Sequence, residues 1–201
     1  MAYGMEKKQL NTLPDKEQLV TSWFEQYANS FLKYGLQIKN DRELVKDVIQ
    51  ELFAGIWHSS ENIWDIKSAK NYLFISFRRK LFKAIESEKK RQSVGAVNVI
   101  DETVPSNLEL AVKREESDQL SSSIMQIVAT LSQRQREIIF LRFYEELDLT
   151  EIGEIMGLNY QATRNLLYKA VKNLRQEASH HQNLRNIPLH LFLISFVGFL
   201  K

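Results

Sequence analysis

The apolar residues between Leu44 and Trp57 recur in adjacent pairs at helical spacing. They are Leu44, Val45, Val48, Ile49, Leu52, Phe53, Ile56 and Trp57. A pattern of this kind places all of them on one broad face of an α-helix, with the polar residues on the other face. The segment is therefore predicted to be an amphipathic helix that must pack against other helices.

Other parts of the chain repeat this pattern. A second apolar stripe runs from Leu19 to Leu32, and a third helix is predicted from near Ala69 to about Arg91. With 7 Gly and 3 Pro in 201 residues, the chain has too few turn formers for a β-rich fold. The periodicity fails between Gln92 and Asn107, and the stretch after it is acidic. We therefore expect an all-α fold with two small helical domains joined by a flexible acidic linker.

The sequence from Thr150 to Arg175 predicts a helix-turn-helix. A helix that opens with a capping box at Asp148 ends at Gly157, where the residue type favours a left-handed turn. Asn159 can cap the following helix, which is rich in basic residues and has no acidic residue before Arg175.

Such a helix fits the major groove of DNA. Arg164 and Asn165 can pair with base edges, whereas Lys172 and Arg175 are better placed for phosphates. The alternative is an ordinary solvated basic helix in a bundle.

Basic and aromatic residues are also mixed in the third predicted helix. Arg78, Arg79, Lys80 and Lys83 form a positive cluster. Tyr72, Phe74, Phe77 and Phe82 precede it or lie within it. Positive charge beside aromatic rings is typical of surfaces that bind single-stranded DNA. An aromatic stripe at helical spacing is also typical of a core, so both interpretations stay open.

Three segments in this order resemble the extracytoplasmic-function group of bacterial RNA polymerase sigma factors. They are "RELVKDVIQELFAGIW", "SAKNYLFISFRRKL" and "LSQRQREIIFLRFYEELDLTEIGEIMGLNYQATRNLLYKAVKNLR". The resemblance implies a region 2-like domain over 15–92, a linker over 93–116 and a region 4-like domain over 117–178. An apolar tail at 179–201 lies beyond the family motifs. Gly153 and Thr163 depart from the family pattern, which usually has alanine and valine at these positions.

The resemblance also implies a role for three groups of residues. In the family, the polar face of the second helix docks on the clamp helices of the polymerase β′ subunit, and here that face is Asp47, Gln50 and Glu51. The −10 element would be melted and bound by Asn62, Trp64, Tyr72, Arg78 and Arg79. The −35 element would be read in the major groove by Arg164, Asn165, Tyr168, Lys169 and Lys172.

The expected partners are core RNA polymerase, through the β′ clamp helices and the β flap, and promoter DNA. An anti-sigma factor is a possible further partner, and we expect no cofactor, metal or small-molecule substrate. With no cysteine, no export signal and no metal-type histidine spacing, the chain is expected to be cytoplasmic and not an enzyme. The rival hypothesis is a helix-turn-helix regulator with an N-terminal sensing or dimerising module.

The tail is strongly apolar from Ile187 to Leu200. It is shorter than the roughly 20 apolar residues that a membrane-spanning helix needs. We therefore expect it to fold back onto the protein as a restraint on binding. Completion of the C-terminal core and docking to an anti-sigma partner are the alternatives.

Overall fold

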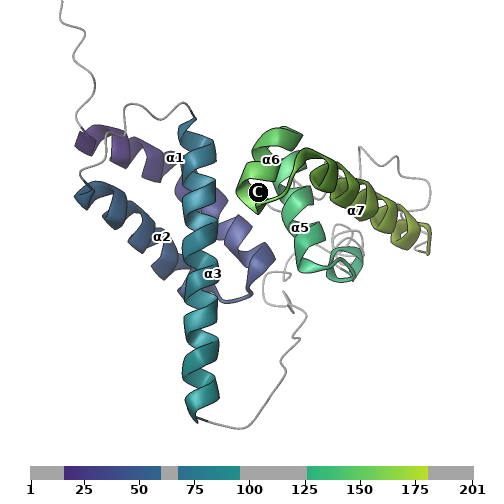
Figure 1. The fold of residues 1–201 in the computed structure, drawn as a ribbon, viewed down its shortest axis with the longest axis horizontal. Helices are drawn as coiled ribbons and strands as arrows, with labels where there is room; N and C mark the ends of the chain where they lie inside the picture. Colours follow the sequence, from purple (N-terminus) through teal and green to yellow (C-terminus); the bar gives the residue numbers. More distant parts are fainter. Residues whose placement is uncertain (1–15, 60–67, 96–125, 181–201) are drawn as a thin grey trace, which may run out of the picture.

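A computed structural model describes residues 16–59, 68–95 and 126–180, and all the elements in these ranges are helices (Figure 1). They are α1 (Lys16–Ile38), α2 (Arg42–His58), α3 (Ala69–Gly95), α5 (Gln133–Ile139), the π-helix η2 (Phe140–Tyr144), α6 (Leu149–Met156) and α7 (Tyr160–His180). The predicted all-α fold is confirmed. Helix α3 continues through the first residues of the predicted linker, and the remainder of the linker and the tail from residue 181 lie outside the described residues.

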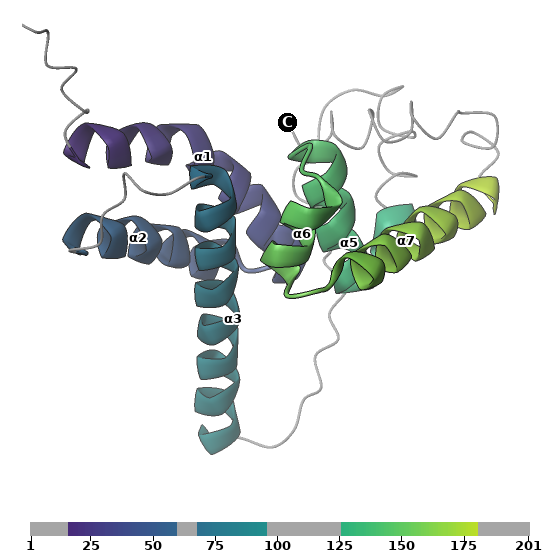
Figure 2. The same ribbon diagram turned by 45° about the horizontal axis from the view of Figure 1, so that its top comes forward.

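Helices α1, α2 and α3 form the first module. Helices α1 and α2 lie side by side, and α3 crosses them and then extends beyond the bundle (Figure 2). Asp41 caps α2 by accepting a hydrogen bond from the backbone N–H of Leu44 at 3.0 Å. The predicted apolar face of α2 is buried from Val45 to Ile56, but Trp57 is exposed at the end of the helix beside Phe24.

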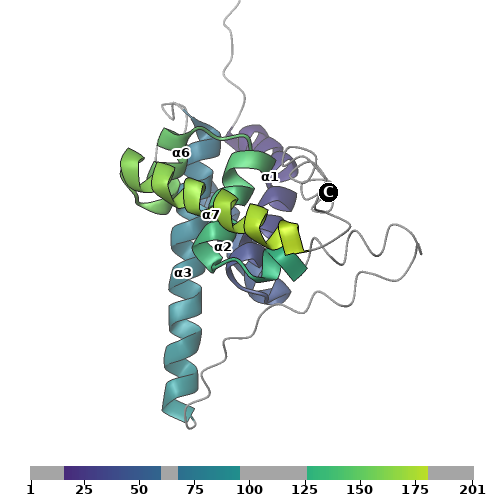
Figure 3. The ribbon, with the colours of Figure 1, turned by 90° about the vertical axis from the view of Figure 1, so that its right-hand side faces the viewer.

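Helices α5, α6 and α7 form the second module, in which α7 packs against both of the others (Figure 3). Ser132 and Gln135 make a capping box at the start of α5. This helix changes into a π-helix at Phe140. The wider turn carries Phe140 and Tyr144, whose rings stack 4.6 Å apart.

The two modules pack directly against each other in this structure. Helix α1 contacts α5, and α3 contacts α6 (Figures 1 and 2). Tyr34 of the first module stacks on Phe140 of the second, with 5.6 Å between the ring centroids, and both side chains are fully buried. The periodicity of the sequence predicted two modules but not this shared core.

None of the helices in the described ranges has the length and apolar character that crossing a membrane requires. The same residues contain no group of three or more His, Asp or Glu side chains that could hold a metal ion.

Candidate nucleic-acid interface

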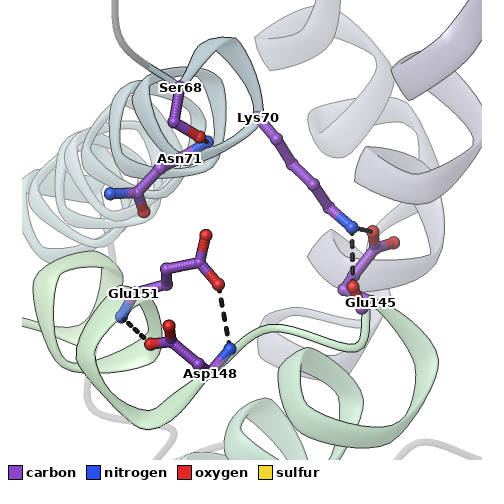
Figure 4. Close-up of polar contacts among 6 residues, drawn as sticks. All are labelled: Ser68, Lys70, Asn71, Glu145, Asp148 and Glu151. Atoms are coloured by element: carbon purple, nitrogen blue, oxygen red, sulfur yellow. Dashed lines mark hydrogen bonds and ion pairs between the residues drawn. The ribbon is translucent and has the colours of Figure 1, made fainter.

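Three local signals position the basic helix α7. Asp148 and Glu151 form a reciprocal capping box at the start of α6, with both bonds at 2.9 Å (Figure 4). Gly157 ends α6 with φ 65°, a left-handed conformation that glycine adopts without a steric penalty. The side chain of Asn159 then accepts a hydrogen bond from the N–H of Ala162 at 2.8 Å. The predicted helix-turn-helix is therefore present, with its predicted caps.

Gly153 and Thr163, two of the residues that depart from the family pattern, lie against each other in this motif. A Cβ atom added to Gly153 would lie 2.8 Å from the backbone oxygen of Leu158 and 3.1 Å from Oγ1 of Thr163. Thr163 is fully buried, and its hydroxyl donates to the carbonyl of Asn159 at 2.9 Å. Because Gly153 has no Cβ methyl group, there is room for the backbone of the turn. There is also room for the hydroxyl group of Thr163, where a valine would have a methyl group.

The solvent-facing side of α7 carries the residues predicted to bind the −35 element. Arg164, Asn165, Tyr168, Lys169 and Lys172 are all exposed. Among the described residues, Asn165 has one polar side-chain contact, in which its Oδ1 accepts a bond from Gln161 at 3.3 Å. The polar groups of these five exposed side chains are therefore accessible to a ligand.

Sequence reasoning missed Tyr160 on this surface. Its side chain is 58% exposed at the first turn of α7. The signal was available, because Tyr160, Arg164 and Tyr168 follow one another at i, i+4 spacing and so share a face.

The polar face of α2 forms a second exposed surface. Asp47, Gln50 and Glu51 are all exposed. No side-chain hydrogen bond or ion pair joins any of the three to the rest of the described chain. The face is therefore not needed for the internal packing of the first module, as expected for a surface that binds a partner.

The residues predicted to melt DNA are placed in different ways. Arg79 is exposed, whereas Tyr72 is partly buried. Arg78 lies over the ring of Phe82, 4.5 Å from its centroid, with its side chain only 17% exposed. Asn62 and Trp64 lie outside the described residues.

The interleaved aromatic residues of α3 belong mainly to the core. Phe74 and Phe77 are fully buried, and both pack on Phe31 with 4.9 Å between ring centroids. The hypothesis that these two rings stack on bases is therefore wrong. The alternative, a core stripe, is right for them because the face of α3 that carries them turns towards α1.

Arg78 has a partner that the sequence did not predict. Its Nε donates to Oε2 of Glu137 at 2.9 Å, across the seam between the modules. Glu137 is fully buried and also accepts bonds from Gln133 at 3.2 Å and from the Tyr34 hydroxyl at 3.4 Å. Burial, and then the negative charge of Glu137, raise the pKa of Tyr34 well above its ordinary value. The signal in the sequence was a glutamate directly before the apolar run of residues 138–141.

A second pair crosses the seam at the start of α3. Lys70 reaches the carboxylate of Glu145 at 2.8 Å and its backbone oxygen at 2.6 Å (Figure 4). The neighbouring Asn71 donates from its amide to the carboxylate of Glu154 on α6. Three glutamates of the second module therefore pair with basic or amide groups of α3.

Comparisons with known proteins agree with this geometry. Residues 127–176 match the family described as sigma-70, region 4. The chain is 24% identical over 171 residues to the RNA polymerase sigma factor SigV of Bacillus subtilis, covering 85% of this chain and 95% of that protein. It is 22% identical over 153 residues to the ECF RNA polymerase sigma factor SigM of the same organism, covering 76% and 90%.

A solved structure extends the likeness to the fold. It is the sigma factor RpoE in complex with the anti-sigma factor NepR from Bartonella quintana. The TM-score is 0.57 at 13% identity, with 80% of this chain and 96% of that chain covered. These likenesses support an extracytoplasmic-function sigma factor. In the residues that match region 4, α6, the Gly157 turn and α7 make up the helix-turn-helix.

Proposed function

We infer that this chain binds core RNA polymerase, directs it to promoters and starts transcription there. The observation that carries this inference is the region 4 helix-turn-helix, with five exposed polar, basic and aromatic residues on α7. The polymerase would supply the chemistry, and this chain would supply recognition and melting in the cytoplasm without a cofactor. Its modules would be 15–92 and 117–178, joined by the linker over 93–116.

Helix α7 would read the −35 element. Arg164 and Asn165 lie near its N-terminal end, the part of a recognition helix that contacts base edges. Arginine pairs bidentately with guanine and asparagine with adenine. Tyr168, Lys169 and Lys172 lie further along the same face, where contacts to phosphates set the position of the helix.

The first module would bind and open the −10 element. Arg79 is exposed on α3, and it can approach the DNA backbone without any rearrangement. Asn62, Trp64 and Tyr72 would hold an unstacked base, by the resemblance to the family. Arg78 would join them through its Nη groups in this arrangement, because its Nε is bonded to the carboxylate of Glu137.

The polymerase would bind at two places. The exposed carboxylates and amide of Asp47, Gln50 and Glu51 would dock on the β′ clamp helices. The second module would lie on the β flap. An anti-sigma factor, as a further partner, would compete with the polymerase for these surfaces.

Transcription with purified components tests this proposal. The chain is mixed with core polymerase and a library of promoter fragments, and the 5′ ends of the transcripts are sequenced. We expect starts to be enriched downstream of one shared pair of −35 and −10 sequences. Specific binding to duplex DNA without any association with core polymerase would favour the rival regulator instead.

A further inference from the structure

Two exposed tyrosines lie on α7. Tyr160 is 58% exposed and Tyr168 is 69% exposed. The described residues have two further large exposed rings, Phe24 and Trp57, and these lie together in the first module. A single exposed ring is common on a protein surface, but a pair of rings beside polar groups is typical of a binding site. The tyrosines of α7 are therefore part of the surface that this helix offers to DNA.

The two rings belong to one ridge of the helix. Tyr160, Arg164, Tyr168 and Lys172 follow one another at i, i+4 spacing, so that rings and cations alternate along the ridge. Neither Tyr160 nor Arg164 has a side-chain hydrogen bond or ion pair within the described chain. Both side chains are therefore available to a ligand.

The neighbouring ridge of α7 has no ring. Gln161, Asn165 and Lys169 lie along it, and Nε2 of Gln161 donates to Oδ1 of Asn165 at 3.3 Å. Amide and cationic groups distinguish base pairs by their donors and acceptors, whereas a ring distinguishes them by apolar contact. The apolar group that the major groove presents is the 5-methyl group of thymine. A thymine methyl group is therefore the base feature that a ring on α7 can recognise.

The position of Tyr160 decides which of the two rings lies nearest the bases. Tyr160 is the first residue of α7, and the N-terminal residues of a recognition helix are those that contact base edges. The four residues from Tyr160 to Arg164 rise by about 6 Å along the helix axis. That distance is about two base-pair steps of roughly 3.4 Å.

We propose that Tyr160 is a specificity-determining residue whose ring packs on the 5-methyl group of a thymine, about two base pairs from a guanine that pairs with Arg164. A tyrosine side chain has only two rotatable bonds, so little conformational entropy is lost when the ring is fixed in the groove. The proposal rests on the proposed function in placing this thymine in a −35 element. The contact between α7 and the thymine itself does not need polymerase.

The first arm of the test is a selection for DNA sequence. Duplexes with a randomised segment long enough for both promoter elements are selected by the full-length chain, once alone and once with core polymerase, and the bound DNA is sequenced. The wild type should enrich a thymine and a guanine about two base pairs apart.

Single substitutions assign these two preferences. Tyr160→Ala should lose the thymine and keep the guanine, and the retained guanine shows that α7 is still folded and bound in the groove. Arg164→Ala should give the reverse result. Tyr160→Phe should keep both preferences because the ring is unchanged. Gln176→Ala, at an exposed position nearer the other end of α7, is the control and should also keep both.

The second arm removes only the methyl group from the DNA. The selected thymine is replaced by uracil in a labelled duplex, and binding is followed by fluorescence anisotropy under the condition that gave the selection. The wild type and Tyr160→Phe should bind the uracil duplex about fourfold more weakly, the effect of one methyl group lost from an apolar contact. Tyr160→Ala should bind the two duplexes equally.

A thymine preference that survives in Tyr160→Ala would overturn the proposal, and so would an equal effect of uracil on that variant and on the wild type. Loss of the preference in Tyr160→Phe would assign the contact to the hydroxyl group and so contradict a contact through the ring. Selection by the chain alone but never with polymerase would refute the proposed function and still decide the role of Tyr160. No selection under either condition would refute both.

Discussion

At the scale of single residues, the contact between Gly153 and Thr163 sets how closely α6 approaches α7. The backbone oxygen of Leu158 lies 2.8 Å from where a Cβ of residue 153 would be, and a backbone atom cannot move aside as a flexible side chain can. The angle at which α7 leaves the turn therefore depends on the absence of a methyl group.

We expect Gly153→Ala to lower the free energy of unfolding by about 1–3 kcal/mol, the usual cost of overpacking a tight site. Urea unfolding followed by circular dichroism measures this change. Gly55→Ala is the control, because the nearest atom to its added Cβ would be Nζ of Lys80 at 3.9 Å. That change should stabilise the helix by roughly 0.5–1 kcal/mol. Equal effects at the two glycines would contradict the packing argument.

Tyr34 gives the seam a dependence on alkaline pH. Its raised pKa means that the folded state holds the phenol proton more tightly than the unfolded state does. The contribution of Tyr34 to stability is therefore complete below its ordinary pKa of about 10. It is lost as the pH rises from there towards the folded-state pKa.

Tyr34→Phe removes this titration while keeping the ring. The wild type should lose stability relative to this variant above pH 10, by up to about 1.4 kcal/mol for each pH unit. Unfolding measured at intervals between pH 8 and pH 11.5 would show the difference. A constant difference over that range would contradict the assignment to Tyr34.

Among the elements, α7 carries the proposed base-reading and phosphate-binding positions on its exposed side. Arg164→Ala or Asn165→Ala should weaken initiation at promoters with particular −35 base pairs, each by about 1–3 kcal/mol. Transcription from a set of promoters with single −35 changes measures this preference.

Lys172→Ala serves as the comparison on the same helix. It should lower activity evenly across sequences and flatten the dependence on salt, because one phosphate contact is lost. If all three substitutions give equal losses at every promoter, the helix contacts phosphates alone.

The α2 face should be required for polymerase binding but not for folding. Asp47→Lys with Glu51→Lys should abolish the complex with core polymerase and leave the melting temperature nearly unchanged, since both side chains are exposed and unpaired in the described chain. Pull-down and thermal unfolding measure the two effects. Glu17→Lys with Glu25→Lys makes the same charge change on exposed positions of α1 and should keep the complex.

For the whole molecule, the features that could be predicted from the sequence are those that depend on residues close together in the chain. The caps at Asp148 and Asn159, the left-handed Gly157 and the apolar face of α2 all follow from residues a few positions apart. The exposure of the predicted residues on α7 follows from helical periodicity in the same way.

Contacts between distant parts of the chain could not be predicted in this way. Arg78 and Glu137 are 59 residues apart, and Tyr34 and Glu137 are 103 apart. Periodicity shows that a residue is buried but not what buries it, so Phe74 and Phe77 could be read as surface or as core. Trp57 follows the apolar pattern of α2 yet is 44% exposed, because it lies at the end of that helix.

If the chain directs transcription as we propose, it must bind core RNA polymerase as a subunit. Sedimentation velocity of the fluorescently labelled chain, alone and with core polymerase, measures this binding. We expect the labelled chain to move as a one-to-one complex with the polymerase, at a signal that saturates on titration. A folded chain that keeps sedimenting alone at every polymerase concentration would show that it is not a polymerase subunit.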